Sequence, residues 1–265
     1  MSIWTQLALI WLLAALMMLA GWWWQRRNDN AGIVDVLWAS GLAGAALLLA
    51  LLGDGAWWPR MLLAVCGGGW AARLAWHLRD RVFSEAEDGR YRHLRRHWQG
   101  NQGKFLLFFQ FQAALIVLFA LPFVAVASNT RVEPAWLVAG FLIWAASVLG
   151  ESIADRQLAR FRQQPGNKGK TCDGGLWRYS RHPNYFFEWL HWFAYVAMAV
   201  GAPLAWLAWC GPVIMYVFLR WISGIPFTEE QSLRSRGESY RDYQRRTPML
   251  IPWFPKTDTA KRIEE

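Results

Sequence analysis

Cysteine is scarce in this chain, and its few copies are far apart. Cys66 and Cys210 lie in apolar stretches, whereas Cys172 lies in a basic one. The 3 Cys residues show no metal-ligand spacing, and an odd number at such distances argues against a disulfide framework. We therefore expect no metal site and no disulfide-stapled fold.

Other signatures of soluble proteins are missing as well. No alternation of apolar and polar residues indicates a β-strand, so no GxGxxG motif follows a strand and a Rossmann fold is excluded. No low-complexity linker, internal repeat or separate soluble domain interrupts the chain. Only the end, residues 257–265, is typical of a loose tail.

The N-terminal stretch lacks the basic start of a signal peptide. Apolar residues run from Ile3 to Trp24, and Arg26 and Arg27 follow them. A signal-peptide core has roughly 7–15 apolar residues, so this run is too long. We expect a retained first membrane span with a positive stop behind it.

Long apolar runs are what the chain has in abundance. Hydrophobic residues make up 55% of it and charged residues 18%, and 20 residues are Trp. A membrane-spanning helix needs roughly 20 consecutive apolar residues, and about seven stretches qualify. The sequence thus predicts an all-α, polytopic integral membrane protein with a single transmembrane domain, residues 1–256. The expected spans are 3–24, 33–52, 56–78, 105–127, 134–151, 183–202 and 203–222.

Basic residues are distributed unevenly between the connecting segments. Segments 25–32, 79–104 and 152–182 and the part after Ser223 are rich in Lys and Arg, whereas segment 53–55 contains neither. The positive-inside rule then places the N-terminus outside and the C-terminus in the cytoplasm. The net charge of +9 suits membrane lipids or an anionic cofactor and requires no nucleic acid.

Polar side chains gather where the sixth span begins. Pro183 suits the first turn of that helix, where its missing N–H has no partner. Helix N-termini favour anions, and Arg binds phosphate through charge-assisted hydrogen bonds. We expect an anion-binding mouth here; the alternative is a basic stop sequence that contacts lipid headgroups. The side chains concerned are Arg178, Arg181, His182, Asn184 and Tyr185.

Charged groups within the spans form a second set of candidates. Glu188 and His191 are three residues apart and so share one face of the sixth span, and Asp35 begins the second span. Charges in a span are costly and usually functional. The alternatives are a packing pair for Glu188 and His191, and an interfacial position for Asp35. Glu-x-x-His is only half of a di-iron set, so a metal is not expected.

The segment after the last span has a helical pattern. A helix is expected from Glu229 to about Arg245, with Leu233, Tyr240 and Tyr243 on one broad side. A Thr-Pro pair ends it, and an apolar stretch follows. An amphipathic helix alone would lie on the membrane, but this arrangement favours a folded cap.

Two motifs resemble a known superfamily of membrane enzymes. GLWRYSRHPNYFFEW (175–189) and EEQSLRSRGESYRDYQRRTPMLIPWF (229–254) are similar to the C-terminal half of steroid 5α-reductase-like proteins, and most of all to their bacterial relatives of unassigned function. Sterol reductases and isoprenylcysteine carboxyl methyltransferases share the same pattern. The resemblance covers about residues 150–255 and extends to E-x-E-D-x-R-Y at 85–91. It implies a bacterial cytoplasmic (inner) membrane location.

The resemblance also implies a cofactor and the residues that hold it. In the reductase branch the cytoplasmic C-terminal half binds NADPH, and a lipophilic substrate enters from the bilayer. The basic loop would neutralise the phosphates through Arg162, Lys168 and Lys170. By position, the other cofactor-binding residues would be Asp155, Arg178, Arg181, His182, Asn184, Tyr185, Glu188, Glu230, Arg234, Tyr240, Tyr243 and Arg246.

One departure from the family pattern concerns the catalytic acid. The steroid enzymes hold the substrate carbonyl with a Gln-Glu pair in the second span and a Tyr at the end of the third, and this chain has no such Gln-Glu pair. Asp35 is the only acid in the second span, and Tyr91 is the nearest tyrosine. We expect Tyr91, Asp35 or Glu188 to supply the acid.

Three functions remain open from the sequence. The first is an NADPH-dependent reductase of a lipophilic enone or alkene, a CH–CH oxidoreductase of lipid metabolism. The second is a membrane methyltransferase that uses S-adenosylmethionine. The third is a membrane scaffold without enzymatic activity. Asn184 after His-Pro and the basic loop 160–170 favour the reductase, because S-adenosylmethionine carries no phosphate. For the methyltransferase the cofactor residues would be Arg181, His182, Tyr185, Glu229, Glu230 and Arg234.

Overall fold

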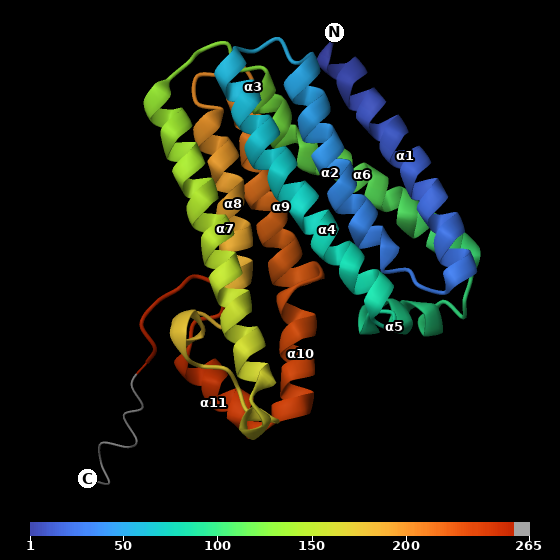
Figure 1. Ribbon diagram of the computed structural model, residues 1–265, viewed down its shortest axis with the longest axis vertical. Coiled ribbons are helices and arrows are strands. Elements are labelled where there is room, and N and C mark those ends of the chain that lie inside the picture. The colour runs from blue at the N-terminus through green and yellow to red at the C-terminus, as the bar shows by residue number, and fades with distance from the viewer. Residues whose placement is uncertain (257–265) are drawn as a thin grey trace. The chain divides into compact units, whose positions relative to one another are not determined.

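A computed structural model describes residues 1–256, and every element within that part is a helix. Contacts divide the chain into two compact units (Figure 1). Unit 1 comprises Met1–Phe141 and Tyr195–Gly211, and unit 2 comprises Leu142–Ala194 and the chain from Pro212 onward. The expected loose tail, 257–265, lies outside the described residues.

Unit 1 is built around its longest buried helix, α6, which packs against α1, α2 and η4. Four rings of α6, those of Phe105, Phe109, Phe119 and Phe123, are fully buried and form the core of this unit. The elements are α1 (Ile3–Asn28), α2 (Ile33–Leu52), α3 (Trp57–Leu63), the π-helical turn η1 (Ala64–Gly68), α4 (Gly69–Ser84), α5 (Gly89–His97), α6 (Gln102–Ala127) and the 3-10 turn η4 (Ala205–Trp209).

Unit 2 is organised by the close approach of α7 to α8. A Cβ atom on Gly150 would lie 2.4 Å from the ring of Phe187, so the two helices touch where one of them has no side chain. The helix of the fifth span continues beyond residue 151, because α7 ends only at Gln163. The elements that lie wholly or mostly in this unit are α7 (Pro134–Gln163), η2 (Pro165–Asn167), η3 (Gly175–Arg178), α8 (Pro183–Met198), α9 (Cys210–Val217), η5 (Phe218–Ile222), α10 (Ile225–Arg236) and α11 (Glu238–Arg246); the start of α7, the end of α8 and the first two residues of α9 belong to unit 1.

Several helices are long and apolar enough to cross a membrane. Large apolar side chains such as Leu51 and Leu107 are exposed on them, as expected for surfaces that contact lipid. The chain is thus compatible with an integral membrane protein. The 5 candidate spans are Ile3–Asn28, Ile33–Leu52, Gln102–Ala127, Pro134–Gln163 and Ala205–Arg236.

The structure confirms the all-helical class but not seven spans. The stretch expected to span at 56–78 is divided by the π-helical turn η1 into α3 and α4. The stretch expected at 183–202 forms α8, whose 16 residues reach about 24 Å. That is shorter than a hydrocarbon core of roughly 30 Å.

The prediction of a single helix from Glu229 to about Arg245 is wrong. The structure has two helices, and α10 begins four residues earlier, at Ile225. Gly237 separates α10 from α11 with φ 55° and ψ −125°, a conformation that glycine adopts far more readily than residues with a Cβ. The break places α11 as a separate element after α10, so the two helices can contribute to one network from different directions.

Candidate functional site

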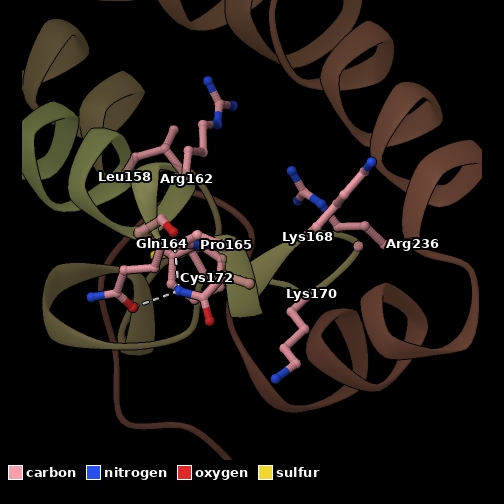
Figure 2. A pocket seen from close by; sticks show the side chains of 11 residues that line it. Leu158, Arg162, Gln164, Pro165, Lys168, Lys170, Cys172 and Arg236 are labelled. Atoms are coloured by element: carbon pink, nitrogen blue, oxygen red, sulfur yellow. Dashed lines mark hydrogen bonds between the residues drawn. The ribbon is translucent and has the colours of Figure 1, made fainter.

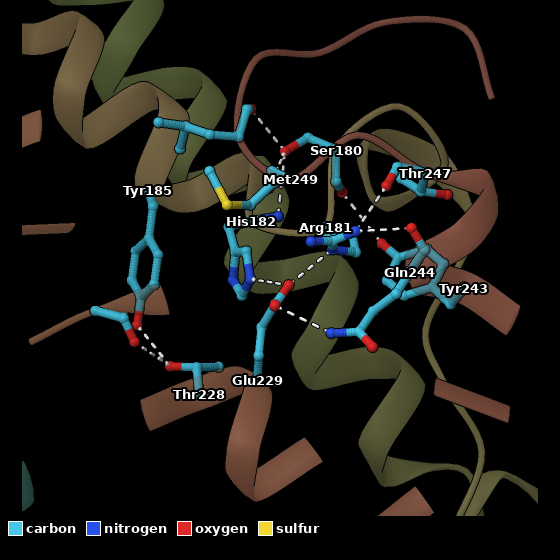
Figure 3. Close-up of polar contacts among 12 residues, drawn as sticks. Ser180, Arg181, His182, Tyr185, Thr228, Glu229, Tyr243, Gln244, Thr247 and Met249 are labelled. Carbon is cyan, nitrogen blue, oxygen red and sulfur yellow. Dashed lines mark hydrogen bonds and ion pairs between the residues drawn. The ribbon is translucent and has the colours of Figure 1, made fainter. Parts of the chain in front are cut away.

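Glu229 on α10 lies at the centre of a hydrogen-bond network in unit 2 (Figure 3). Its Oε1 accepts from Arg181 Nε at 2.7 Å and from His182 Nε2 at 3.3 Å. Its Oε2 accepts from Gln244 Nε2 at 3.0 Å, and the Tyr240 hydroxyl donates to Oε1 at 3.5 Å. One carboxylate therefore joins α10, α11 and the loop before α8. We call this set the Glu229 network.

The side chain of Arg181 makes several hydrogen bonds within and beside the Glu229 network. Its Nη1 donates to the carbonyl oxygens of Gln244 at 2.8 Å and Thr247 at 3.1 Å. Its backbone N–H donates to the carbonyl of Pro248 at 2.9 Å. The side chain is only 12% exposed and that of Glu229 16%. A nearly buried ion pair with this many bonds holds the segment after α11 against the loop before α8.

His182 is buried beside Glu229 and is neutral at pH 7. Burial lowers the pKa of the imidazole, although the hydrogen bond and charge of Glu229 act in the opposite direction. Because a carboxylate only accepts, the proton of the neutral ring lies on Nε2. The imidazole ring stacks on the ring of Tyr185, with 5.4 Å between the two ring centroids. The Tyr185 hydroxyl lies 3.2 Å from Thr228 Oγ1. These contacts fix the first turn of α8 to α10.

Tyr243 and Ser180 close the network from the side of α11. The Tyr243 hydroxyl donates to the carbonyl oxygen of Trp177 and, at 3.1 Å, to that of Ser180. Burial raises the pKa of Tyr243, so its hydroxyl stays protonated and remains a donor. Ser180 Oγ donates to the carbonyl of Leu250 at 2.7 Å. The loop 174–182 is thus bonded on both sides to the C-terminal segment.

A pocket of about 370 Å³ lies in unit 2 at the other end of α10 (Figure 2). Its walls come from the end of α7, the turn η2, the loop that follows η2 and the last residue of α10. That volume falls within the range of small-molecule sites. The lining residues are Leu158, Phe161, Arg162, Gln164, Pro165, Asn167, Lys168, Gly169, Lys170, Cys172 and Arg236.

The pocket carries four cations and no acid. Arg162, Lys168, Lys170 and Arg236 extend in different directions around it (Figure 2). Within residues 1–256 none of the four forms an ion pair with a carboxylate. The like charges of Arg162 and Arg236 repel each other. We call this cavity, with its four cations, the basic pocket. A ligand with several negative charges would relieve the repulsion between the cations.

Cys172 is the one thiol in the basic pocket. It is 6% exposed, and burial raises the pKa of its thiol. A thiol is a nucleophile only as the thiolate, so this residue is unreactive at neutral pH. The pocket is therefore suited to binding rather than to covalent chemistry.

Asp155, Asn184 and Glu188 meet where α7 faces α8. Asn184 Nδ2 donates to Asp155 Oδ1 at 3.2 Å. Glu188 lies one turn further along α8, within range of the charges of Asp155 and Glu151. No group of His, Cys, Asp and Glu in the described residues is arranged to hold a metal ion.

The other expected cofactor residues lie on the surface of unit 2. Arg234 pairs with Glu230 at 2.5 Å, but the two side chains are 77% and 60% exposed. Arg246 lies 3.4 Å from Asp173, and Arg178 is exposed. Exposed pairs of this kind contribute about 0–1 kcal/mol to stability.

Sequence reasoning from the family pattern placed Glu230 in the cofactor site and left out Arg236. The structure places Glu229 rather than Glu230 inside the network, and Arg236 in the basic pocket. The helical repeat of this segment could have indicated both Glu229 and Arg236. One face of the helix carries, at spacings of four, three and four residues, Ile225, Glu229, Ser232 and Arg236. Ile225 and Ser232 are buried, so this is the inner face of α10.

Unit 1 holds a second cluster, formed by two further candidates from the sequence. The Tyr91 hydroxyl on α5 donates to Asp35 Oδ1 on α2 at 2.6 Å. Arg90 Nη2 lies 3.3 Å from Asp35 Oδ2, and the Arg90 backbone N–H donates to Asp88 Oδ1 at 2.8 Å. Arg81 also pairs with Asp88. In this cluster every charge has a partner of opposite sign.

Tyr91 is fixed as a protonated donor. It is 5% exposed, and burial together with the charge of Asp35 raises its pKa well above the usual value. A cavity of about 20 Å³ adjoins the cluster and is lined by Asp35, Arg81 and Asp88 among others. That is enough for about one water molecule and no more.

The comparisons with known proteins cover most of the chain. Residues 21–247 match the family described as "Protein of unknown function (DUF1295)". The chain belongs to this family. It is associated with steroid 5α-reductase-like membrane proteins, which agrees with the resemblance seen in the motifs.

One curated relative carries a named activity. Over 50 residues the chain is 40% identical to "Probable O-methyltransferase ustE" from Ustilaginoidea virens. The match spans 19% of this chain and 18% of that protein, so it covers less than a fifth of either. No solved structure matches the chain.

Proposed function

We propose that this protein is a membrane-embedded reductase that binds NADPH in the basic pocket and reduces a lipophilic enone or alkene. The observation that carries the proposal is the basic pocket itself. Four cations from three different elements surround it, and no carboxylate of residues 1–256 pairs with them. Unpaired charges that repel one another favour a polyanionic ligand.

The charge of NADPH fits this set of donors. The cofactor carries a pyrophosphate and a 2′-phosphate, and each phosphate oxygen accepts charge-assisted hydrogen bonds of the kind that Arg and Lys donate. Arg162, Lys168, Lys170 and Arg236 would hold these groups. The cofactor supplies a hydride when it is bound. The Glu229 network would keep α10 and the loop before α8 in fixed positions, so that the pocket is formed before the cofactor arrives.

A proton must also reach the substrate, and each unit contains one candidate donor. In unit 1, Tyr91 is held by Asp35, with its pKa raised by burial. In unit 2, Glu188 lies near Glu151 and Asp155. Reduction of an enone places the hydride on one carbon and the proton on its neighbour, so only one of the two is needed. Tyr91→Phe and Glu188→Gln would identify it through loss of turnover without loss of NADPH binding.

A methyltransferase is the second candidate function. It is favoured by the short match to a protein named as an O-methyltransferase. The basic pocket argues against it, because S-adenosylmethionine has a sulfonium and no phosphate. A cationic cofactor would add to the repulsion between Arg162 and Arg236 rather than relieve it.

The deciding experiment is cofactor binding to the detergent-purified protein. We would titrate NADPH, NADH and S-adenosylmethionine by calorimetry into the wild type and into two matched variants. Arg162→Ala removes a cation of the basic pocket. Arg160→Ala removes an exposed cation of the same helix that does not line the pocket.

The expected result is micromolar binding of NADPH, weaker binding of NADH, and a loss of NADPH affinity in Arg162→Ala alone. Tighter binding of S-adenosylmethionine would support the methyltransferase instead. If none of the three binds, the protein is better described as a membrane scaffold and the reductase proposal fails.

A further inference from the structure

The C-terminal segment of unit 2 presents an unusual group of apolar side chains. Ile251, Trp253 and Phe254 are 58%, 70% and 74% exposed, although they follow a polar helix that covers the loop 174–182. Tyr179 lies against them, with its ring 5.9 Å from that of Phe254 in an edge-to-face contact. We call Tyr179, Ile251, Trp253 and Phe254 the aromatic knob.

The backbone beneath the aromatic knob is held at several points. Trp253 N–H donates to the carbonyl of Tyr179 at 2.9 Å, and Lys256 N–H donates to that of Arg246 at 2.9 Å. The side chain of Leu250 is buried, and its carbonyl accepts from Ser180. The apolar side chains are therefore presented by an ordered segment, and little further ordering is needed when they bind something.

The position of the aromatic knob along α7 can be read from hydrogen bonds within unit 2. Trp177 Nε1 donates to the carbonyl of Ala154 at 2.9 Å, and Leu176 N–H donates to Gln157 Oε1 at 2.9 Å. Tyr179 is two residues after Trp177. Ala154 lies three residues, or about 5 Å, beyond the expected end of the apolar span at residue 151. The knob is therefore tied to α7 close to the expected end of its apolar span.

One side of α7 just before this level is apolar and open. Leu149 is 60% exposed and Ile153 is 41% exposed. In Figure 1 the red segment that follows α11 runs back beside the lower part of α7. The lipid-facing side of α7 thus extends to the level at which the loop carrying Tyr179 is attached.

The charged residues next to the knob in the sequence, Arg178 and Lys256, are both basic. Arg178 and Lys256 are exposed on either side of it, and residues 247–256 contain no Asp or Glu. Trp, Phe and Tyr beside Lys and Arg are typical of segments that lie at a membrane–water interface, where rings enter the acyl boundary and cations meet anionic headgroups. A protein partner would need no such position relative to a membrane span.

We propose that the aromatic knob is a membrane anchor, which inserts into the boundary between headgroups and acyl chains in the leaflet at that end of α7. The anchor fixes the C-terminal cap, and with it the Glu229 network, at a constant depth. This inference does not depend on the reductase activity, since none of the four residues of the aromatic knob lines the basic pocket and the anchor requires no cofactor.

The test is a spin-label accessibility measurement in lipid nanodiscs that contain phosphatidylglycerol. Cys210 is replaced by Ala, and Cys66 and Cys172 are buried, so that a label on Phe254→Cys reports on that site. Leu149→Cys on α7 provides the lipid reference, and Arg241→Cys on the exposed side of α11 provides the water reference. Molecular oxygen reports contact with lipid, and a water-soluble nickel chelate reports contact with solvent.

We expect the label at 254 to resemble that at 149, with a ratio of oxygen to nickel accessibility several-fold above that at 241. If Phe254→Cys does not fold, Ile251→Cys provides the same measurement. Nickel accessibility at 254 equal to that at 241 would overturn the proposal. A label shielded from both reagents would also overturn it, because a protein surface or a second copy of the chain would then cover the knob.

Discussion

The two ends of α10 use charge in opposite ways. Near its start, Glu229 is nearly buried and receives hydrogen bonds from four side chains. At its end, Arg236 lines a pocket with three other cations and pairs with no carboxylate of the described chain. The same helix thus contributes one charge that the fold requires and one that the fold leaves available.

The difference separates structural from ligand-binding charges. A buried ion pair that loses one partner leaves a charge without compensation, whereas a cation that has no carboxylate partner can be removed at little cost to folding. Residues of the first kind should therefore change stability when substituted, and residues of the second kind should change ligand affinity.

The largest effect is expected for Glu229→Ala. This substitution leaves the nearly buried Arg181 without its carboxylate, and breaking such a pair costs about 3–5 kcal/mol of unfolding free energy. Thermal denaturation in mild detergent would measure the loss. Glu230→Ala, at the neighbouring exposed position, should cost no more than about 1 kcal/mol. Equal effects of the two substitutions would mean that the Glu229 network does not hold the cap.

Arg236→Ala should reduce NADPH affinity without changing stability. A hydrogen bond to a charged group is worth about 1.5–3 kcal/mol, which corresponds to roughly a 10- to 150-fold increase in Kd. Arg234→Ala is the matched control, because Arg234 lies on the same helix but pairs with Glu230 at the surface. Calorimetry would give both values. A loss of affinity in Arg234→Ala and none in Arg236→Ala would contradict the assignment of the pocket.

Tyr243→Phe should destabilise the cap by an intermediate amount. It removes the donor that serves the buried carbonyl oxygens of Trp177 and Ser180, and an unsatisfied buried acceptor costs about 1–3 kcal/mol. Thermal denaturation would again report the change. Replacement of Tyr179 by Phe is the control, since no side-chain hydrogen bond of the Tyr179 hydroxyl is present in residues 1–256. A Tyr243→Phe protein as stable as the wild type would show that these bonds contribute nothing.

The smallest effect concerns pH and His182. Burial lowers the pKa of the imidazole in the folded protein, so the unfolded chain binds a proton at higher pH than the folded chain does. The contribution of His182 is fully present above the unfolded pKa of about 6.5 and is lost as the pH falls below it. One proton gives a slope of at most about 1.4 kcal/mol per pH unit.

Denaturation profiles between pH 7.5 and 5 would measure this slope for the wild type and for His182→Gln. Because carboxylates such as Glu229 also titrate toward the acid end, only the difference between the two profiles is informative. The wild type should lose more stability than the variant as the pH falls. Parallel profiles would show that His182 is not buried in its neutral form.

The sequence predicted the fold class well because long apolar runs leave few alternatives to membrane helices. Two of the seven expected spans, 56–78 and 183–202, are not confirmed, each for a local reason. Apolar runs do not reveal a π-helical turn such as η1, and they do not show that α8 ends at Met198, before a glycine at 201 with φ 86°. The prediction of one continuous tail helix is wrong at Gly237, where a glycine with positive φ ends one helix and begins the next.

The candidate site was predicted in part. Three cations of the pocket are close in the sequence, so that a shared site could be predicted from it: Arg162, Lys168 and Lys170. Arg236 joins them from another element, and only the folded chain brings it there. Glu229 and Glu230 are the same residue type, so composition does not distinguish their roles. In the structure Glu229 faces inward and Glu230 faces solvent.

Gly150 carries a consequence for the evolution of the family. The space between α7 and α8 is set by a missing side chain opposite Phe187, only three residues after Asn184, which bonds to Asp155. A larger residue at position 150 would separate the helices and break that bond unless the ring became smaller. Homologues with a side chain at 150 should therefore lack an aromatic residue at 187, and the two positions should vary together across the family.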